Sequence, residues 1–248
     1  MIILKSRQEI EKMKIPNRLV AEVLGEVVKK IKAGISTIEL DRLAESLIVK
    51  KRGVPAFKGY RGYPNSLCIS INEQVVHGIP SSRKLKEGDI VSLDLGIYYD
   101  GYYGDAALTV GVGNISQDAE RLLDSTRKAL YIGIEKAKAG NHLSDISYAI
   151  QSYVEGEGFS VVRAFVGHGI GTSLHEDPQV PNFGEAGNGP VLKNGMVIAI
   201  EPMVNAGVSD VEVLEDDWTT VTADRSLSAH FEHTVAITDN GAEILTKV

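Results

Sequence analysis

Two carboxylates, Asp94 and Asp105, interrupt apolar, β-prone sequence between Val91 and Val110. Each lies in a run of Val, Leu, Ile, Tyr or Ala that predicts a strand with at least one buried face, and Asp100-Gly101 indicates the turn between the strands. A buried carboxylate needs a hydrogen bond, an ion pair or a bound cation, and no Lys or Arg occurs in this stretch. A metal ion is the simplest partner for the pair.

A second pair of acids occupies equivalent places in an internal repeat. The tripeptide KAG precedes an expected helix in each half, and KEGDIVSLD, which ends at Asp94, matches KNGMVIAIE, which ends at Glu201. The spacing from the KAG glycine to the acid agrees within one residue between the halves. The next strand then supplies Asp105 in the first half and Glu232 in the second.

His168 adds a nitrogen ligand to these acids, because it stands between glycines directly after an expected strand, in VGHGIGTSLHE. Four converging carboxylates repel one another and demand positive charge. Oxygen donors with one nitrogen suit Mn, Fe(II), Co or Zn, and they hold two ions if some carboxylates bridge. The sequence therefore predicts a metal site made of Asp94, Asp105, His168, Glu201 and Glu232.

Other catalytic motifs are missing from the sequence. The glycine-rich loop around His168 fits neither G-x-G-x-x-G nor a Walker pattern, and there is no G-x-S-x-G elbow. His175-Glu176 does not open an H-E-x-x-H motif, because Gln179 stands where the second His would be. The metal set is the chemistry that the motifs favour.

The elements around these residues are expected to repeat in order. A capping box at Ser6 opens a helix with an apolar stripe, which Pro16 is expected to kink or break, and a capping box at Ser36 opens the next helix. The second half supplies two more helices and a strand, at about residues 116–139, 144–155 and 159–166.

One catalytic domain of residues 1–248 suits this repeat better than two domains. Pseudo-repeats of approximately 1–113 and 114–248 would pack around a pseudo-twofold axis, and each would project two carboxylates toward it. The expected fold class is α+β, with a curved, mixed β-sheet and helices on its outer face.

The composition restricts the partners. The formal charge is -7, which argues against general nucleic-acid affinity. The single cysteine, Cys68, excludes an intrachain disulfide. The N-terminal apolar run is too short for a signal peptide, and no run reaches the length of a membrane span. We therefore expect a cytoplasmic protein with no membrane partner and no specific nucleic acid.

The chain resembles the type I methionine aminopeptidases, whose pita-bread fold is shared with prolidase, aminopeptidase P and creatinase. The resemblance covers nearly the whole length and assigns a two-metal site to the same five residues. It implies a bacterial-type, stand-alone catalytic domain, since the N-terminal zinc-binding extension and the type II helical insertion are missing. Its most specific segments are SLCISINEQVVHGIP, LDLGIYYDGYYGDAA, GHGIGTSLHEDPQV, IEPMVN and SLSAHFEHT.

The same resemblance places further side chains around the substrate: His77 and His175 in the cleft, and Tyr60, Tyr63, Cys68, Trp218, Phe57 and Leu174 around the pocket for the N-terminal side chain. An apolar pocket that contains sulfur suits a thioether. Leu174 stands where some bacterial relatives have an aromatic residue, and the position of Phe57 also varies in the family. The width of the pocket therefore stays open.

The implied activity is hydrolytic removal of the N-terminal Met from nascent polypeptides and peptides whose second residue is small. The expected nucleophile is a water that bridges two divalent ions, with Glu201 as general base. His175 would stabilise the oxyanion, and His77 would bond near the scissile amide. The protein is expected to be a monomer, and transient ribosome contact is left open.

Three alternatives remain at this point. The first is an X-Pro aminopeptidase or prolidase of the same fold, which is disfavoured because those enzymes usually add a large N-terminal domain that this chain lacks. A non-catalytic binding module should have lost some of the ligands, and all five are present. A purely structural metal site seldom needs two further histidines in a cleft.

Overall fold

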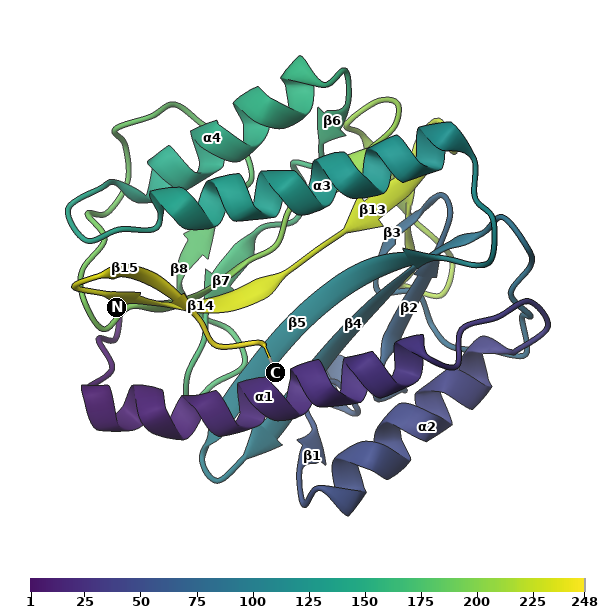
Figure 1. Cartoon of the computed structure of the whole chain (residues 1–248), viewed down its shortest axis with the longest axis horizontal. Coiled ribbons are helices and arrows are strands. Elements are labelled where there is room, and N and C mark those ends of the chain that lie inside the picture. The colour runs from purple at the N-terminus through teal and green to yellow at the C-terminus, as the bar shows by residue number, and fades with distance from the viewer. Residues whose placement is uncertain (248) are drawn as a thin grey trace.

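Two pairs of helices cover one side of the strands. The computed structural model describes residues 1–247, and Figure 1 shows α1 and α2 over one half of the molecule and α3 and α4 over the other. Among these described residues, no helix is long and apolar enough to cross a membrane. The helices are α1 (Arg7–Val28), α2 (Thr37–Lys50), α3 (Gln117–Lys136) and α4 (Leu143–Gly156), and a short 3-10 helix, η1, spans Tyr60–Gly62.

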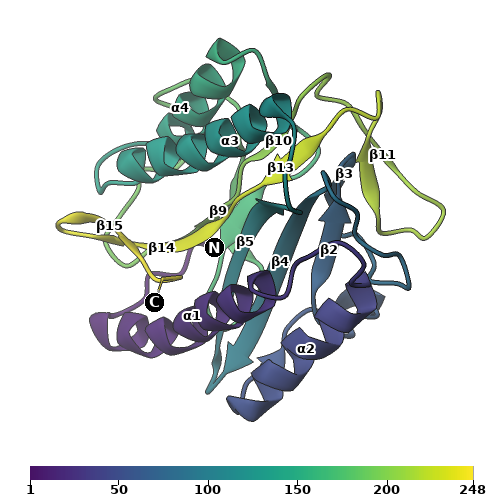
Figure 2. The ribbon, with the colours of Figure 1, turned by 45° about the vertical axis from the view of Figure 1, so that its right-hand side comes forward.

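The strands form a 4-stranded, a 5-stranded and two 3-stranded sheets, and every strand pair among the described residues is antiparallel. The first half supplies β1 (Val54–Pro55), β2 (Cys68–Ile71), β3 (Gln74–Val76), β4 (Ile90–Tyr99) and β5 (Tyr102–Gly111). The second supplies β6 (Ser160–Val161), β7 (Gly167–Gly169), β8 (Glu176–Val180), β9 (Val197–Ile200), β10 (Met203–Asn205), β11 (Val211–Val213), β12 (Thr220–Thr222), β13 (Ser228–His230), β14 (His233–Thr238) and β15 (Gly241–Ile244). The expected single mixed sheet is thus divided into antiparallel ladders, which Figure 2 shows side by side.

The hairpin of β4 and β5 matches the sequence prediction. Asp100 and Gly101 form its two-residue turn with φ of 46° and 91°, the left-handed backbone that a tight hairpin requires. Asp94 pairs with Ala107, and Asp105 pairs with Gly96. Because directly paired residues share a face and side chains alternate along a strand, the two acids are diagonal neighbours on one face.

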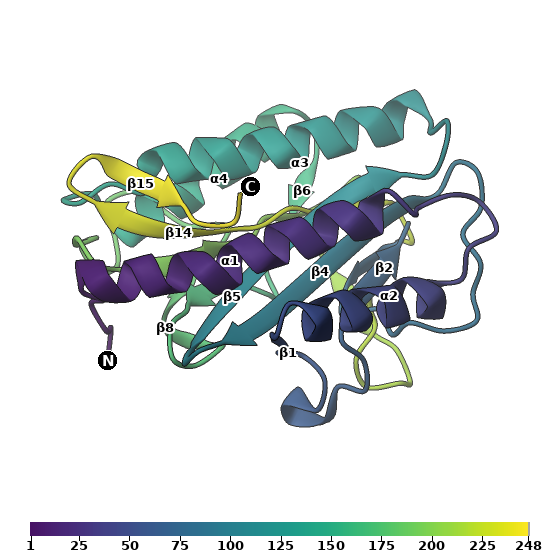
Figure 3. The ribbon, with the colours of Figure 1, turned by 60° about the horizontal axis from the view of Figure 1, so that its bottom comes forward.

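The long helix α1 crosses β4 and β5 (Figure 3). Of the kink or break expected at Pro16, the break is wrong, because α1 continues through the proline. Close packing holds the helix there: a Cβ on Gly104 of β5 would lie 2.6 Å from the backbone nitrogen of Asn17. The Asn17 side-chain amide also donates to the carbonyl of Met13 at 2.8 Å. Burial of the helix on the sheet outweighs the hydrogen bond that the proline removes.

The strand expected over residues 159–166 is wrong in extent. Only Ser160–Val161 forms a strand, β6, which pairs with β10. The chain then leaves the ladder, so that Phe165 faces a cavity and His168 lies on the next strand, β7. A uniform apolar run cannot reveal this departure, because burial against a sheet and burial beside a cavity need the same side chains.

A buried ion pair holds the segment before α1 against the first residue of β8. Lys5 Nζ lies 2.6 Å from Glu176 Oε2, and only 4% and 7% of the two side chains are exposed. Glu176 also accepts a hydrogen bond from the backbone of Ser173 at 3.1 Å. This acid therefore fixes the loop that carries His175.

We expect Lys5→Met to lower the free energy of unfolding by about 3–5 kcal/mol, because it leaves a buried carboxylate without its counter-charge. Urea denaturation measures the change. The matched control is Lys29→Met, whose ion pair with Glu26 is exposed and should contribute little. A Lys5→Met protein within about 1 kcal/mol of the parent would contradict the expectation.

Candidate metal centre and substrate cleft

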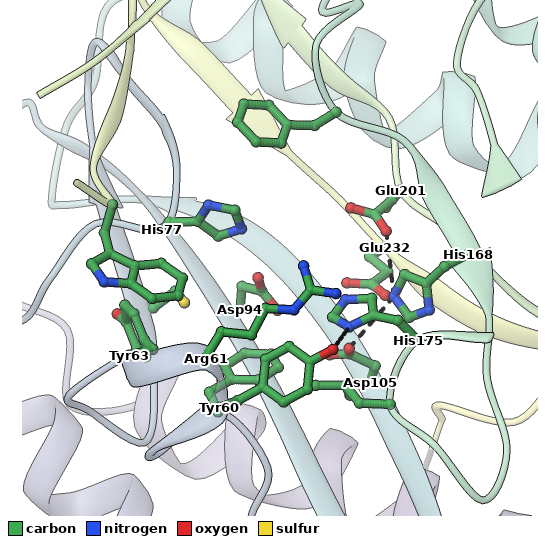
Figure 4. A pocket seen from close by; sticks show the side chains of 15 residues that line it. Tyr60, Arg61, Tyr63, His77, Asp94, Asp105, His168, His175, Glu201 and Glu232 are labelled. Carbon is green, nitrogen blue, oxygen red and sulfur yellow. Dashed lines mark hydrogen bonds and ion pairs between the residues drawn. The ribbon is translucent and has the colours of Figure 1, made fainter.

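A cavity of about 270 Å³, called the site cavity below, opens between the two halves of the chain (Figure 4). Every site residue expected from the sequence lines it: Phe57, Tyr60, Tyr63, Cys68, His77, Asp94, Asp105, His168, Leu174, His175, Glu201, Trp218 and Glu232. Arg61 and Phe165 line it as well and were not anticipated. Side chains from distant parts of the sequence therefore meet at one place, and their individual roles stay predictions.

The four acids lie on antiparallel strands or directly beside them. Asp94 and Asp105 come from β4 and β5, Glu201 follows β9 directly, and Glu232 lies between β13 and β14. Two hydrogen bonds join the halves here, since the Glu232 amide donates to the carbonyl of Ala107 and the Thr234 hydroxyl donates to the carbonyl of Asp105, each at 2.8 Å. The backbone thus fixes where the carboxylates converge.

Three of the predicted ligands form the tightest group. Asp105, His168 and Glu232 each offer a ligand atom, and these atoms lie within 4.8 Å of one another. Asp94 and Glu201 line the same cavity outside that group. Within the described chain, buried oxygens of Asp94, Asp105 and Glu232 have no hydrogen-bond partner. Unpaired buried carboxylate oxygens are costly, so this donor set fits divalent cations.

Burial raises the pKa of all four acids in the metal-free protein, and neighbouring acids raise the pKa of three of them further. Burial raises the pKa of Asp94 to about 7. Burial and the neighbouring Asp94 raise the pKa of Asp105 well above its usual range, and they raise that of Glu201 likewise. For Glu232, burial comes first and Asp105 second. Bound cations would reverse this balance by favouring the carboxylate form.

His168 is oriented so that one ring nitrogen faces the acids. Its Nδ1 lies 2.9 Å from the carbonyl oxygen of Gly169, so Nδ1–H donates there and the lone pair of Nε2 is free. Nε2 is 3.6 Å from Glu201 Oε1 and 3.9 Å from Asp105 Oδ2. Burial lowers the pKa of His168 to about 4, which keeps the imidazole neutral at physiological pH.

His175 lies beside His168 but has a different partner. Its Nδ1 is 2.7 Å from the hydroxyl of Tyr60, and the rings of the two histidines are 4.3 Å apart. When Tyr60 donates to Nδ1, the proton of the imidazole sits on Nε2 and can be donated into the cavity. Burial, followed by the neighbouring His168, lowers the pKa of His175 to about 3, so the ring is a neutral donor.

The remaining wall of the site cavity is largely apolar. Tyr63 meets Trp218 edge to face with ring centroids 5.1 Å apart, and the ring of His77 lies 6.0 Å from that of Trp218. Tyr63 donates its hydroxyl to the carbonyl of Gly78 at 2.9 Å, which fixes the ring. Cys68 lies on β2, where it pairs with Asp94 of β4, and it is buried. An unbranched, apolar side chain suits this wall.

One buried histidine near the acids escaped the sequence interpretation. His230 is 2% exposed, and its Nε2 has no hydrogen-bond partner in the described chain and lies 3.7 Å from Glu201 Oε2. Its backbone amide donates to the Thr109 hydroxyl at 2.9 Å. The available signal was its place two residues before Glu232, a spacing that puts alternate residues of an extended chain on one side.

The metal-free protein should lose stability as the pH rises from about 6.5 to 8.5. The raised pKa values of the four acids keep protons on the folded protein that the unfolded chain has released, so stability falls with pH. The buried histidines, such as His168, work in the opposite direction only below their unfolded pKa of 6.5. Each retained proton costs about 1.4 kcal/mol per pH unit.

Urea denaturation in the presence of a chelator, at the two pH values, measures this loss. Added Mn²⁺ should restore more stability at the higher pH, because the ion binds the ionised carboxylates. Equal stability of the chelated protein at both pH values would contradict the account of the four acids.

These features describe a metal-binding hydrolase site, and the sequence defines its class: the chain matches metallopeptidase family M24 over residues 11–239 and belongs to that family. It is 56% identical to a methionine aminopeptidase of Clostridium perfringens, over 100% of both chains. The solved methionine aminopeptidase of Thermotoga maritima is 51% identical and superposes with a TM-score of 0.98 over 100% of both chains. The expected family and the pita-bread fold are confirmed.

A more distant neighbour carries the fold with another activity in its name. A prolidase from Pyrococcus furiosus superposes with a TM-score of 0.81 at 26% identity, over 99% of this chain and 66% of the prolidase. The fold is thus shared between these peptidases, and the choice between their substrates depends on the site.

Proposed function

We propose that the protein is a metal-dependent methionyl aminopeptidase that removes the N-terminal Met from peptides and nascent polypeptides when the second residue is small. The observation that carries this proposal is the site cavity, where acids and neutral histidines face an apolar wall that contains Cys68, Tyr63 and Trp218. The full-length likeness to proteins named methionine aminopeptidase supports the same substrate.

The site would hold two divalent ions, which could be Co, Mn, Fe(II) or Zn, on Asp94, Asp105, His168, Glu201 and Glu232. When bound, such ions polarise the scissile carbonyl, lower the pKa of water and attract the free amine of the substrate. Metallopeptidase family membership and the donor group support the use of divalent metal. The number and identity of the ions belong to the proposal.

Glu201 would take the proton of the attacking water and pass it to the leaving amine. Its carboxylate lies at the end of β9, within 3.6 to 3.7 Å of the ring nitrogens of His168 and His230. With cations bound, Glu201 would be held in its carboxylate form, which is the form that can accept a proton. Return of that proton to the departing nitrogen completes the cleavage.

The two cleft histidines would act on the peptide bond itself. His175, neutral and supported by the Tyr60 hydroxyl, would donate from Nε2 to the carbonyl oxygen as negative charge develops there. His77 packs edge to face against Phe165 at 5.3 Å and against Trp218 at 6.0 Å, and from there it would bond near the scissile amide. The methionine side chain of the substrate would pack against the apolar wall of the site cavity.

Cleavage after methionine is preferred here to cleavage before proline. The methionine aminopeptidases of Clostridium perfringens and Thermotoga maritima are 56% and 51% identical to this chain over their full length, whereas the prolidase is 26% identical. A non-catalytic binding module is disfavoured, because the complete ligand set lines one cavity.

We further propose one catalytic unit, residues 1–248, that acts as a cytoplasmic monomer on nascent polypeptides, with ribosome contact left to experiment. Its halves, about 1–113 and 114–248, would be related by a pseudo-twofold axis. The order of two helices followed by strands in each half supports this repeat. Superposition of the halves should align Asp94 with Glu201 and Asp105 with Glu232, and non-equivalent strands would contradict it.

Release of Met from Met-Ala-Ser by the purified protein tests the proposed activity. Chelator-treated protein should be inactive, and addition of a divalent ion from the set above should restore cleavage. Full activity of a rigorously metal-free preparation, or inactivity with every one of these ions, would overturn the proposal.

A further inference from the structure

Arg61 stands at the mouth of the site cavity, and the proposed chemistry does not use it. Among the described residues that line the cavity, it alone carries a Lys or Arg side chain. Arg61 also lines a neighbouring cavity of about 540 Å³, called the side groove below, which shares His168 and His175 with the site cavity. Figure 4 shows its guanidinium among the site side chains. A cation thus stands where the two cavities join.

The backbone presents this side chain in an unusual conformation. Arg61 has φ of 49° and lies between Gly59 and Gly62, whose φ values are 84° and 94°. The amide of Gly59 donates to the carbonyl of Tyr63 at 2.8 Å, and the amide of Tyr63 donates to the carbonyl of Tyr60 at 2.9 Å. A non-glycine residue seldom adopts this left-handed region, and such residues concentrate at functional sites.

The guanidinium has no ionic partner of its own. Within residues 1–247, Arg61 forms no ion pair and no side-chain hydrogen bond, and its Cζ lies 5.4 Å from the centroid of the Tyr60 ring. Lys58, on the same loop, differs because it pairs with Glu45 at 2.7 Å. The donors of Arg61 are therefore available to a ligand.

The other charges of the side groove are already paired. Asp177 pairs with the N-terminal amine of Met1, and Glu176 pairs with Lys5 at 2.6 Å. Burial keeps His168 and His175 neutral by lowering the pKa of each. Among the described charged residues that line the side groove, Arg61 is thus the one without an ionic partner, and it attracts anions.

A peptide with its scissile carbonyl beside His175 would lie close to Arg61, because both residues line the site cavity and the side groove. With the methionine side chain against the apolar wall, the residues after the cleaved bond would extend toward the side groove. We propose that Arg61 binds a carboxylate of the departing peptide and so sets a preference for negative charge after the second residue. This inference rests on the proposed function.

Two sources of carboxylate are distinguished by two sets of substrates. The first set is Met-Ala-Glu, Met-Ala-Gln and Met-Ala-Lys, all as C-terminal amides, which tests the side chain of the third residue. The second set is Met-Ala-Ser with a free or an amidated C-terminus. In low salt, kcat/KM should favour each negative group by about threefold over its neutral counterpart and disfavour Lys by a similar factor. Screening in about 0.5 M salt should reduce these ratios.

Variants of Arg61 test whether this residue causes the preference for negatively charged peptides. Arg61→Gln should bring the charged and neutral peptides of each set to equal kcat/KM, and Arg61→Glu should reverse their order. The matched control is Lys58→Gln, which removes a cation from the same loop outside the site cavity and should keep the parent ratios.

Parent protein that cleaves all peptides of a set equally, or unchanged ratios in Arg61→Gln, would overturn the role of Arg61 while the aminopeptidase activity stands. Release of no Met from any of the peptides would overturn the proposed function and this inference together.

Discussion

Glu201→Gln is expected to lower kcat by about 10³-fold in the presence of excess divalent metal. The substitution preserves size and hydrogen-bonding shape but removes the group that accepts and returns the proton, a role that contributes about 10² to 10⁴ in rate. Loss of one anionic ligand should also weaken metal binding, so the assay is run at saturating metal. Steady-state kinetics and metal analysis on the same sample separate the two effects.

A matched control for this variant is Glu120→Gln, which neutralises an exposed acid on α3, away from the site cavity. It should keep the parent kcat. A Glu201→Gln protein that holds its metal and retains kcat within about tenfold of the parent would remove Glu201 from the proton transfer.

The second large effect separates two histidines that are close in sequence and space. His175→Ala should keep its bound metal and lose about 10²-fold or more in kcat, with KM little changed, because it removes one donor to the developing oxyanion. His168→Ala should instead weaken metal binding, and excess metal should restore part of its activity. The different partners of their Nδ1 atoms, Tyr60 for His175 and Gly169 for His168, are the structural basis.

Metal analysis and kinetics on both variants decide the assignment. Metal loss from His175→Ala would make that residue a ligand. An unchanged kcat with metal retained would leave it without a catalytic role.

The four acids could be predicted from two signals in the sequence, a hairpin turn and an internal repeat. Asp100-Gly101 sets the register of the hairpin, and that register puts Asp94 and Asp105 on one face. The internal repeat then pointed to Glu201 and Glu232 without any knowledge of the contacts between the halves. Capping boxes likewise located the starts of α1 and α2 to within a residue.

The residues that were missed depend on tertiary contacts. His230 gained its place through hydrogen bonds with Thr109, more than a hundred residues away in sequence. Arg61 lines the site cavity from a turn in which its backbone is left-handed. An arginine in a sequence gives no indication of that backbone conformation. Pro16 stayed inside a helix because β5 packs against it. Local pattern cannot weigh such contacts, and the roles of the pocket residues came from the family resemblance alone.

Competition between two peptides tests the central claim most directly. The chelated protein is reconstituted with each divalent ion in turn, and hydrolysis of Met-Ala-Ser is compared with that of Gly-Pro-Ala under the same conditions. The site predicts rapid release of Met from Met-Ala-Ser and little cleavage of Gly-Pro-Ala. Faster cleavage of Gly-Pro-Ala would contradict the account and assign the protein to the X-Pro peptidases of its fold.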